Sequence, residues 1–302
     1  MNKSFTLIEI LVVIVVIGIL SAFILVGMSS ITDSANITKS QTFANSLDSS
    51  LLLDRVSQWK FDELNTAIHG TTPVKDSWGN NNGTFYTNNG SVEKLLTSCP
   101  FGKCISFDGT DDYIHCGTGG NIGLSSITYS AWAKTSDSSG SRPIMSKDSS
   151  LLNWFGAMFY PFHYNGDNKA LFYITTDIYV YSSTAVNDNK WHHIVGVCDR
   201  TKHISPDIYL DGKKNNGSFS GYCDEIGTIV DGGALRLGYE TNTNQYFLGA
   251  IDDVRMYNQA LSSSQAQQNY FLGLNNLYKN KGITFNEFNQ RIVELRSNLV
   301  NQ

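Results

Sequence analysis

The sequence predicts an α+β fold with three parts: a long N-terminal helix, an antiparallel β-sandwich of the jelly-roll type, and a short C-terminal helical segment. An apolar run begins within the first ten residues, the middle of the chain has period two between Asn/Gly/Asp turns, and a period of 3.6 returns after Leu261. These changes of period predict boundaries at 1–4, 5–57, 58–261 and 262–302.

The N-terminal run has the length and polarity of a membrane anchor. Residues 10–32 are 23 residues without a charge, and as a helix they would span about 35 Å, enough to cross a bilayer. Lys3 precedes the run, so the positive-inside rule keeps the four-residue leader in the cytoplasm and exports the rest. Glu9 interrupts the start of the run, and a carboxylate in hydrocarbon requires a partner.

The stretch Phe5-Thr6-Leu7-Ile8-Glu9 resembles the class III signal of type IV prepilins and type II secretion pseudopilins. The resemblance implies cleavage between Ser4 and Phe5 by a prepilin peptidase, N-methylation of Phe5, and pairing of Glu9 with the amino terminus of a neighbouring subunit. Two positions depart from the family: Ser4 replaces the usual Gly, and Val26 stands where many members have Pro. An ordinary signal anchor is the alternative.

Beyond the apolar run, Phe43, Leu47 and Leu51 recur at four-residue spacing and predict one stripe of an amphipathic helix that continues to about Ser57. In a pilin this stripe would dock the head domain, and elsewhere it would be a generic stalk.

The region 58–261 contains alternating or wholly apolar runs between turn sequences, which predicts a single antiparallel sandwich. Six strings in order resemble the laminin-G-like, concanavalin A-like superfamily. They are Trp59-Lys-Phe-Asp-Glu63, Asp76-Ser-Trp-Gly-Asn-Asn-Asn-Gly-Thr84, Ile105-Ser-Phe-Asp-Gly-Thr-Asp-Asp-Tyr-Ile114, Lys190-Trp-His-His-Ile-Val195, Ile208-Tyr-Leu-Asp-Gly212 and Gly249-Ala-Ile-Asp-Asp-Val-Arg-Met-Tyr-Asn258. This superfold carries lectins, glycosidases and spacers, so the resemblance predicts fold more sharply than ligand.

The sequence does not predict an enzyme. Glucanases of this fold carry an E-x-D-x-x-E strand that places two carboxylates in one cleft, and this chain has no such string. The pairs Asp224-Glu225 and Asp252-Asp253 are adjacent, so their side chains are expected on opposite faces. His192 and His193 are likewise interpreted as neighbouring strand residues beside a packed Trp191.

A structural calcium ion is predicted from hard oxygen ligands. Asp76, Asn80 and the turn around them would supply carboxylate and carbonyl oxygens. In related sandwiches such an ion joins the first loop to an Asp on the last strand, and Asp252 matches that position. In the alternative, Asp76 and Asn80 only shape the turn. The acidic turn Asp108–Asp112 is interpreted as a hairpin tip rather than a second ion site.

The five cysteines permit disulfides in an exported protein. Cys99 and Cys104 flank a Pro-Phe-Gly-Lys turn and are predicted to pair. Cys198 and Cys223 flank a hairpin and are a second candidate pair, which leaves Cys116 alone. Buried free thiols in strands are the alternative.

Aromatic residues concentrate in the middle of the chain, where an exposed subset would form a glycan-binding platform and a buried subset would form core. They are Trp154, Phe155, Phe159, Tyr160, Phe162, Tyr164, Tyr179 and Tyr181. The formal net charge of −5 and the lack of a basic stripe argue against nucleic acid as a partner.

At the C-terminus, residues 263–279 predict a polar-amphipathic helix, and Thr284-Phe-Asn-Glu287 is a capping box for a second one. Phe288, Ile292, Leu295 and Leu299 share one face of that second helix and must be buried. The pilin-type helix or the sandwich of the same subunit would bury them, or else a neighbouring subunit.

Together these features predict a type IV pilin-like subunit that displays a lectin-like sandwich for adhesion, or for binding a glycan or surface protein. The protein would begin as a single-pass precursor in the cytoplasmic membrane and then join an extracellular filament of its own copies and other pilins. A pseudopilin of a type II secretion or DNA-uptake machine is the alternative, followed by an anchored glycan-active enzyme.

Overall fold

The structure is a computed structural model of the whole chain, which divides into two units, Met1–Ser49 and Ser50–Gln302. It describes residues 54–64, 73–87, 95–120, 123, 125–139, 142–147, 158–160, 168–175, 177–227, 233–241 and 244–297. The predicted leader and apolar run, with Ser4, Phe5 and Glu9, and the stripe residues Phe43, Leu47 and Leu51 therefore lie outside the described residues. Neither helix of the described part has the length and hydropathy needed to cross a membrane.

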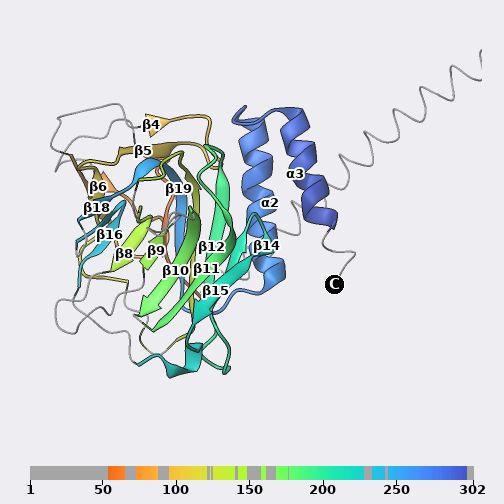
Figure 1. Cartoon of the computed structure of the whole chain (residues 1–302). Coiled ribbons are helices and arrows are strands. Elements are labelled where there is room, and N and C mark those ends of the chain that lie inside the picture. The colour runs from red at the N-terminus through yellow and green to blue at the C-terminus, as the bar shows by residue number, and fades with distance from the viewer. Residues whose placement is uncertain are drawn as a thin grey trace, which may run out of the picture. The chain divides into compact units, whose positions relative to one another are not determined.

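Two antiparallel sheets form the sandwich (Figure 1). The eight-stranded sheet has the order β14-β13-β12-β7-β19-β5-β4, with β1 also paired to β19. Its strands are β1 (Arg55–Trp59), β4 (Leu95–Leu96), β5 (Cys104–Asp108), β7 (Ile127–Lys134), β12 (His192–Cys198), β13 (Asp207–Leu210), β14 (Lys213–Lys214) and β19 (Leu248–Tyr257).

The nine-stranded sheet has the order β15-β11-β10-β9-β8-β16-β6-β3-β2, and β17 pairs with β18 beside it. The strands are β2 (Pro73–Val74), β3 (Gly83–Tyr86), β6 (Tyr113–His115), β8 (Met145–Lys147), β9 (Met158–Tyr160), β10 (Lys169–Thr175), β11 (Ile178–Ala185), β15 (Asn216–Ser220), β16 (Leu235–Leu237), β17 (Tyr239–Glu240) and β18 (Gln245–Tyr246). A short 3-10 helix, η2, covers Cys223–Glu225.

The space between the sheets is filled by one apolar cluster, because alternate residues of each strand face inwards. Phe85, Ile114 and Leu237 contribute from the nine-stranded sheet, and Ile194 and Ile251 contribute from the eight-stranded sheet. The turn chemistry follows the sequence: Asp211 and Gly212 adopt φ of 51° and 74° and join β13 directly to β14. The predicted antiparallel sandwich is confirmed.

The sandwich begins before the predicted boundary at residue 58. Arg55–Trp59 form β1, which pairs antiparallel with β19, so residues 55–57 belong to the sandwich and not to a helix. Helical periodicity was overridden there because pairing with the long strand β19 satisfies the backbone and buries Ser57 and Trp59 completely.

The two C-terminal helices are α2 (Ser263–Lys279) and α3 (Phe285–Ser297), as the sequence predicted. Figure 1 shows them side by side next to β12 and β14 of the eight-stranded sheet. Gly273 lets α2 approach the sheet closely, since a Cβ there would lie 2.4 Å from the indole ring of Trp132. The backbone N–H of Glu287 donates to the Thr284 hydroxyl over 3.2 Å, which confirms the predicted cap of α3.

The apolar stripe of α3 is buried within this chain. Phe288, Ile292 and Leu295 are each less than a tenth exposed, while Leu299 lies outside the described residues. A Cβ on Gly212 of the β13–β14 turn would lie 3.1 Å from Leu295, so the sandwich forms part of the wall. The sequence allowed three surfaces to bury this stripe, and the sandwich of the same subunit is the one that contacts it.

Candidate functional site

Two tyrosines of the nine-stranded sheet and two of the β17–β18 pair form a continuous group, and we call them the tyrosine cluster: Tyr86, Tyr113, Tyr239 and Tyr246. Tyr86 and Tyr113 are register partners whose rings stack with centroids 5.0 Å apart. Tyr239 and Tyr246 are register partners on β17 and β18, with centroids 4.4 Å apart. Tyr113 and Tyr239 join the two pairs at 5.2 Å.

The strand period explains why the rings of Tyr86 and Tyr113 face outwards. Phe85, Ile114 and Leu237 lie in the core, so their chain neighbours Tyr86, Tyr113 and Arg236 lie on the opposite face. All four tyrosine rings are half-buried, which leaves part of each ring in contact with solvent. The cluster is therefore a fixed aromatic surface rather than core.

Arg236 and His115 add polar groups to this surface. They are register partners on β16 and β6, and the Arg236 guanidinium lies 5.8 Å above the ring of Tyr239. Burial and the nearby Arg236 lower the pKa of His115, so the imidazole is neutral at physiological pH. Its Nδ1 accepts a hydrogen bond from Gly117 N–H, which places the ring proton on Nε2 as a donor.

The hydroxyls of Tyr113 and Tyr246 remain protonated. Burial raises the pKa of Tyr113, and burial followed by the nearby Tyr239 raises that of Tyr246 to about 12. Each of these two hydroxyls can therefore both donate and accept a hydrogen bond at neutral pH.

A second aromatic group lies on β10 and β11 of the same sheet, where Tyr173, Tyr179 and Tyr181 pack around Leu171. Tyr173 and Tyr179 are register partners with nearly parallel rings 6.5 Å apart. Burial, Asp177 and Glu240 raise the pKa of Tyr173 to about 12.

The outcome for the predicted aromatic platform is mixed. Tyr179 and Tyr181 lie half-buried on the outer face, as the platform interpretation requires. Trp154, Phe155, Phe162 and Tyr164 lie outside the described residues, and for Phe159 and Tyr160 only the backbone is described. The sequence did not reveal the tyrosine cluster, because its members come from four strands of two separate sheets that only the tertiary structure brings together.

Asp76 shapes its turn, as one of the two sequence interpretations expected. Its Oδ1 accepts hydrogen bonds from the N–H groups of Gln58, Trp78 and Gly79 over 2.8–3.1 Å, and its Oδ2 accepts one from Asn81. Asn80 is exposed beside it. Most of the acceptor capacity of this carboxylate is already used by the backbone.

Asp252 is fully buried, and one of its oxygens remains available. Its Oδ2 accepts a hydrogen bond from Phe101 N–H at 2.7 Å, while its Oδ1 has no hydrogen-bond partner. Burial and then Asp253 raise the pKa of Asp252 well above its usual range. Of the two predicted carboxylate ligands, Asp76 and Asp252, Asp252 is thus the better candidate. Calcium binding there stays a prediction.

The expectation that Asp252 and Asp253 simply alternate between faces misses a β-bulge. The register shifts between Asp252 and Arg255, and Asp253 adopts a φ of 47°. Both carboxylates are consequently buried, with Asp253 paired to Arg255 at 2.7 Å and bonded to Gln58 at 2.6 Å.

The acidic turn brings oxygens of Asp108, Asp111 and Asp112 within 4.8 Å of one another. Asp112 accepts a hydrogen bond from Asp108 N–H, and Asp108 accepts from Thr110 N–H, each at 2.9 Å. These bonds shape the tip of the β5–β6 hairpin.

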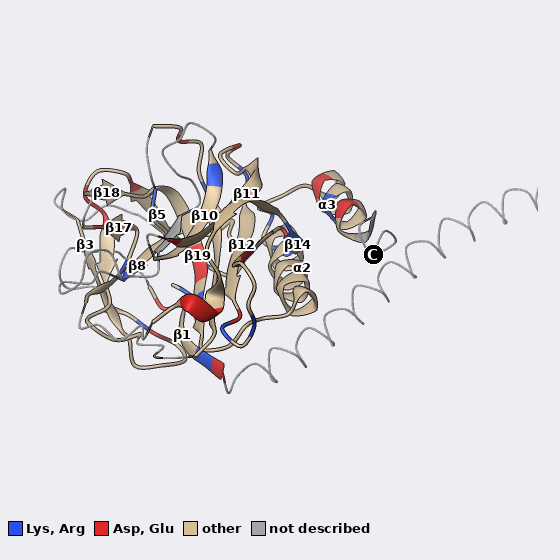
Figure 2. Cartoon of the chain, turned by 60° about the horizontal axis from the view of Figure 1, so that its bottom comes forward, with Lys and Arg blue, Asp and Glu red and all other residues tan. Residues whose placement is uncertain are grey.

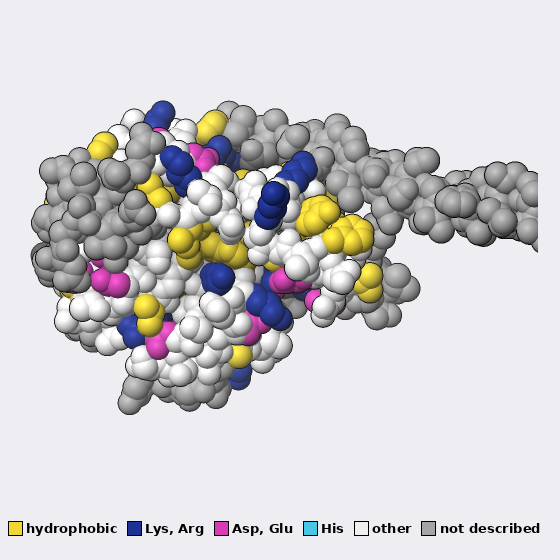
Figure 3. All heavy atoms as spheres, turned by 90° about the horizontal axis from the view of Figure 1, so that it is seen from above, with side chains coloured by type: hydrophobic (Ala, Val, Ile, Leu, Met, Phe, Trp, Pro, Cys, Tyr) yellow, Lys and Arg dark blue, Asp and Glu magenta, His cyan; other side chains and the backbone are white. Residues whose placement is uncertain are grey.

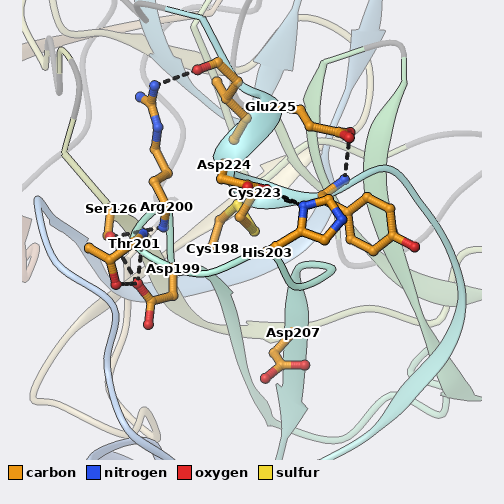
Figure 4. The surroundings of a disulfide bond; sticks show 12 residues. Ser126, Cys198, Asp199, Arg200, Thr201, His203, Asp207, Cys223, Asp224 and Glu225 are labelled. Carbon is orange, nitrogen blue, oxygen red and sulfur yellow. Dashed lines mark hydrogen bonds and ion pairs between the residues drawn. A yellow bond between two sulfur atoms is a disulfide. The ribbon is translucent and has the colours of Figure 1, made fainter.

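Two disulfides are present, Cys99–Cys104 and Cys198–Cys223, with Cα atoms 5.9 and 5.5 Å apart. Cys116 is a free buried thiol whose pKa is raised by burial. The second bridge ties the end of β12 to η2, and beside it the His203 imidazole bonds to Asp224 at 3.0 Å (Figure 4). The predicted first pair and the candidate second pair are both confirmed.

His192 and His193 occupy opposite faces of β12. His193 is buried against Trp132 and Tyr270 and bonds to Ser130 at 2.9 Å. His192 lies between Asp211 at 2.7 Å and Asp188 at 3.0 Å. Burial by itself lowers the pKa of His192, but Asp211 and Asp188 outweigh it and raise that pKa to about 9.

Among the described residues, Lys and Arg lie at separate places along the strands and loops rather than on one continuous stripe (Figure 2).

Comparison with known proteins agrees with this architecture. The chain belongs to the concanavalin A-like lectin/glucanases superfamily, whose model matches residues 108–267. The model of the prokaryotic N-terminal methylation motif matches residues 1–25. The chain therefore joins a pilin-type N-terminal signal to a lectin-like sandwich, as its sequence indicated.

Several solved structures share the fold at low identity. Domain 4 of AbnA, a GH43 extracellular arabinanase from Geobacillus stearothermophilus in complex with arabinotriose, matches with a TM-score of 0.54 and 18% identity over 71% of this chain and 97% of that one. The binding domain of Paraclostridial Mosquitocidal Protein 1 matches with a TM-score of 0.51 and 16% identity over 73% of this chain and 52% of that one.

A structure of botulinum neurotoxin type C, a toxin whose cell entry depends on interaction with two ganglioside molecules, matches with a TM-score of 0.51 and 13% identity over 76% of this chain and 52% of that one. This chain thus spans about half the length of each of these toxin chains. At such identities the likeness shows the fold alone.

Proposed function

We propose that this protein is a type IV pilin-like subunit that displays a glycan-binding sandwich at the cell surface. The observation that carries the glycan part is the tyrosine cluster. Faces of sugar rings are apolar and stack on aromatic rings, while their hydroxyls need donors and acceptors. The cluster offers both, since Arg236 and His115 Nε2 donate beside the four rings.

The similar folds named with saccharides support this proposal. The arabinanase domain was solved with arabinotriose, and the type C neurotoxin interacts with gangliosides. A pilin-type signal would carry the sandwich out of the cytoplasmic membrane into a filament of this chain and other pilins. There a sheet face lined with rings would meet surface glycans.

The glycan part is tested by binding of the full-length protein, in detergent, to immobilised arabinotriose and to a panel of neutral and acidic oligosaccharides. Tyr113→Ala and Tyr239→Ala should each weaken binding of the recognised sugar by about tenfold, on the scale of an aromatic contact. Tyr222→Ala is the matched control, because Tyr222 is an exposed tyrosine that stacks on His203 away from the cluster. Equal loss in all three variants would contradict the assignment.

The filament part is tested by mass spectrometry of purified surface filaments. We expect an N-terminal peptide that begins with methylated Phe5 and lacks the four-residue leader. An intact leader in assembled filaments would contradict it. Recovery of the protein in an envelope secretion complex instead of surface filaments would favour the pseudopilin alternative, and release of reducing ends from the bound sugar would favour a glycan-active enzyme.

A further inference from the structure

A groove of about 640 Å³ opens on the outer face of the eight-stranded sheet, apart from the tyrosine cluster. Residues from β4, β5, β7 and β19 and from the loop before β12 line it, and we call it the Lys134 groove. Seen from above, hydrophobic side chains gather near the centre of the molecule, with Lys and Arg around them (Figure 3). The volume falls in the range of small-ligand sites.

The strand register builds the floor of the groove. Ser106, Ala250 and Lys134 are partners across β5, β19 and β7, so their side chains share one face. Trp132 and Asp252, two positions along from Lys134 and Ala250, lie on this same face, where Trp132 stacks on Tyr270 of α2. The groove therefore lies on the sheet face that carries α2.

Gly249 allows the close backbone contact between β19 and β7 beside the floor. Its φ is 138°, and a Cβ there would lie 2.1 Å from the carbonyl oxygen of Lys134. A residue with a side chain is thus excluded at this position of β19. Asn189 at the rim is also fixed, because its N–H donates to the carbonyl of Thr135 over 2.9 Å.

Side chains supply the recognition groups that we consider in the groove. Strands β19 and β7 each have a partner strand on both sides, and β5 pairs with β4 at Cys104 and Ile105. The lining offers hydroxyls of Ser106 and Ser136 and the amide of Asn189, which suit ring hydroxyls.

The charge of the lining indicates the charge of the ligand. Lys134 is the charged residue among those described as lining the groove, and no carboxylate stands opposite it there. Leu96 and Leu248 at the rim are 42% and 38% exposed and provide apolar faces. A ligand that satisfies this lining carries an anionic group, several hydroxyls and an apolar ring face.

We propose that the Lys134 groove is a second saccharide-binding site, which takes an acidic oligosaccharide of the uronate type with a carboxylate on the Lys134 ammonium. Its sheet, its residues and its ligand charge differ from those of the tyrosine cluster. The proposal does not depend on sugar binding at that cluster.

Binding of trigalacturonate and of the neutral arabinotriose is measured by calorimetry on the full-length protein in detergent at low ionic strength. Lys134→Met removes the ammonium, and Ser106→Tyr fills the floor. Each should weaken trigalacturonate binding by about tenfold, on the scale of a charge-assisted hydrogen bond. Lys190→Met, which removes an equal charge at an exposed lysine paired with Asp188, is the matched control and should leave that binding unchanged.

Tyr113→Ala separates this proposal from the proposed function. Trigalacturonate binding that is lost in Lys134→Met and Ser106→Tyr but kept in Tyr113→Ala and Lys190→Met supports the second site. Absence of saturable trigalacturonate binding, or loss only in Tyr113→Ala, would overturn it. So would binding that arabinotriose or phosphatidylglycerol vesicles compete for as well as trigalacturonate does.

Discussion

Gly196 in the middle of β12 offers a sharp test of how tightly the two sheets pack. It lies opposite Tyr129 of β7 and Ile208 of β13, at the centre of the eight-stranded sheet. A Cβ added there would lie 2.3, 2.5 and 2.7 Å from three atoms of the Phe172 ring in the other sheet. Phe172 is fully buried, so its ring cannot move aside without disturbing the core.

Gly196→Ala should therefore lower the free energy of unfolding by about 1–3 kcal/mol, the usual cost of overpacking. For a domain of this size the melting temperature should fall by roughly 2–4 °C per kcal/mol. Urea unfolding of the full-length protein followed by tryptophan fluorescence measures the first quantity, and calorimetry measures the second.

Two further variants make this test specific. Gly227→Ala adds the same methyl group where no atom lies within 4 Å, and it should leave stability unchanged or slightly raised. Phe172→Leu is destabilising by itself, but combined with Gly196→Ala it should cost less than the sum of the two. Equal unfolding free energies for Gly196→Ala and Gly227→Ala would refute the packing argument.

Three further predictions concern charge. Glu9→Leu should leave the protein in the membrane but greatly reduce its recovery in filaments, because insertion needs only the apolar run; wild-type filament yield would contradict this. The free energy of unfolding should be highest below about pH 6.5 and fall by up to about 3 kcal/mol as pH rises through 9, because the folded pKa of His192 lies above its unfolded value. Urea unfolding at about pH 6.5 and about pH 9 measures the two free energies, and their difference should disappear in His192→Gln. An unchanged difference in that variant would disprove the role of His192. Calcium at a hundredfold excess over Kd should stabilise the fold by about 2.7 kcal/mol. EDTA should then lower the melting temperature of the wild type and of Asp111→Asn but not of Asp252→Asn, and a wild-type curve unmoved by EDTA would count against calcium.

The sequence predicted strands, turns and helix ends correctly where a single local pattern determines them. The period-two runs gave strands β10, β12 and β19, and the Asp211-Gly212 turn gave the β13–β14 hairpin. The capping box at Thr284 gave the start of α3. Each depends on residues close in the chain, so propensity and periodicity were sufficient.

Local patterns failed where distant partners compete. Arg55–Trp59 became a strand because β19, about 200 residues away, offered a free edge. The bulge at Asp253 interrupts the strand alternation that would have placed Asp252 and Asp253 on opposite faces.

The sequence by itself determined the class of this protein: a pilin-type signal followed by a lectin-like sandwich, since both are written in contiguous motifs. Only the tertiary structure decided where ligands could bind. Tyr86, Tyr113, Tyr239 and Tyr246 come from four strands, and the Lys134 groove from four strands and a loop. Their positions follow from inter-strand register, which depends on hydrogen bonds between segments far apart in the chain, and no single stretch of sequence specifies it.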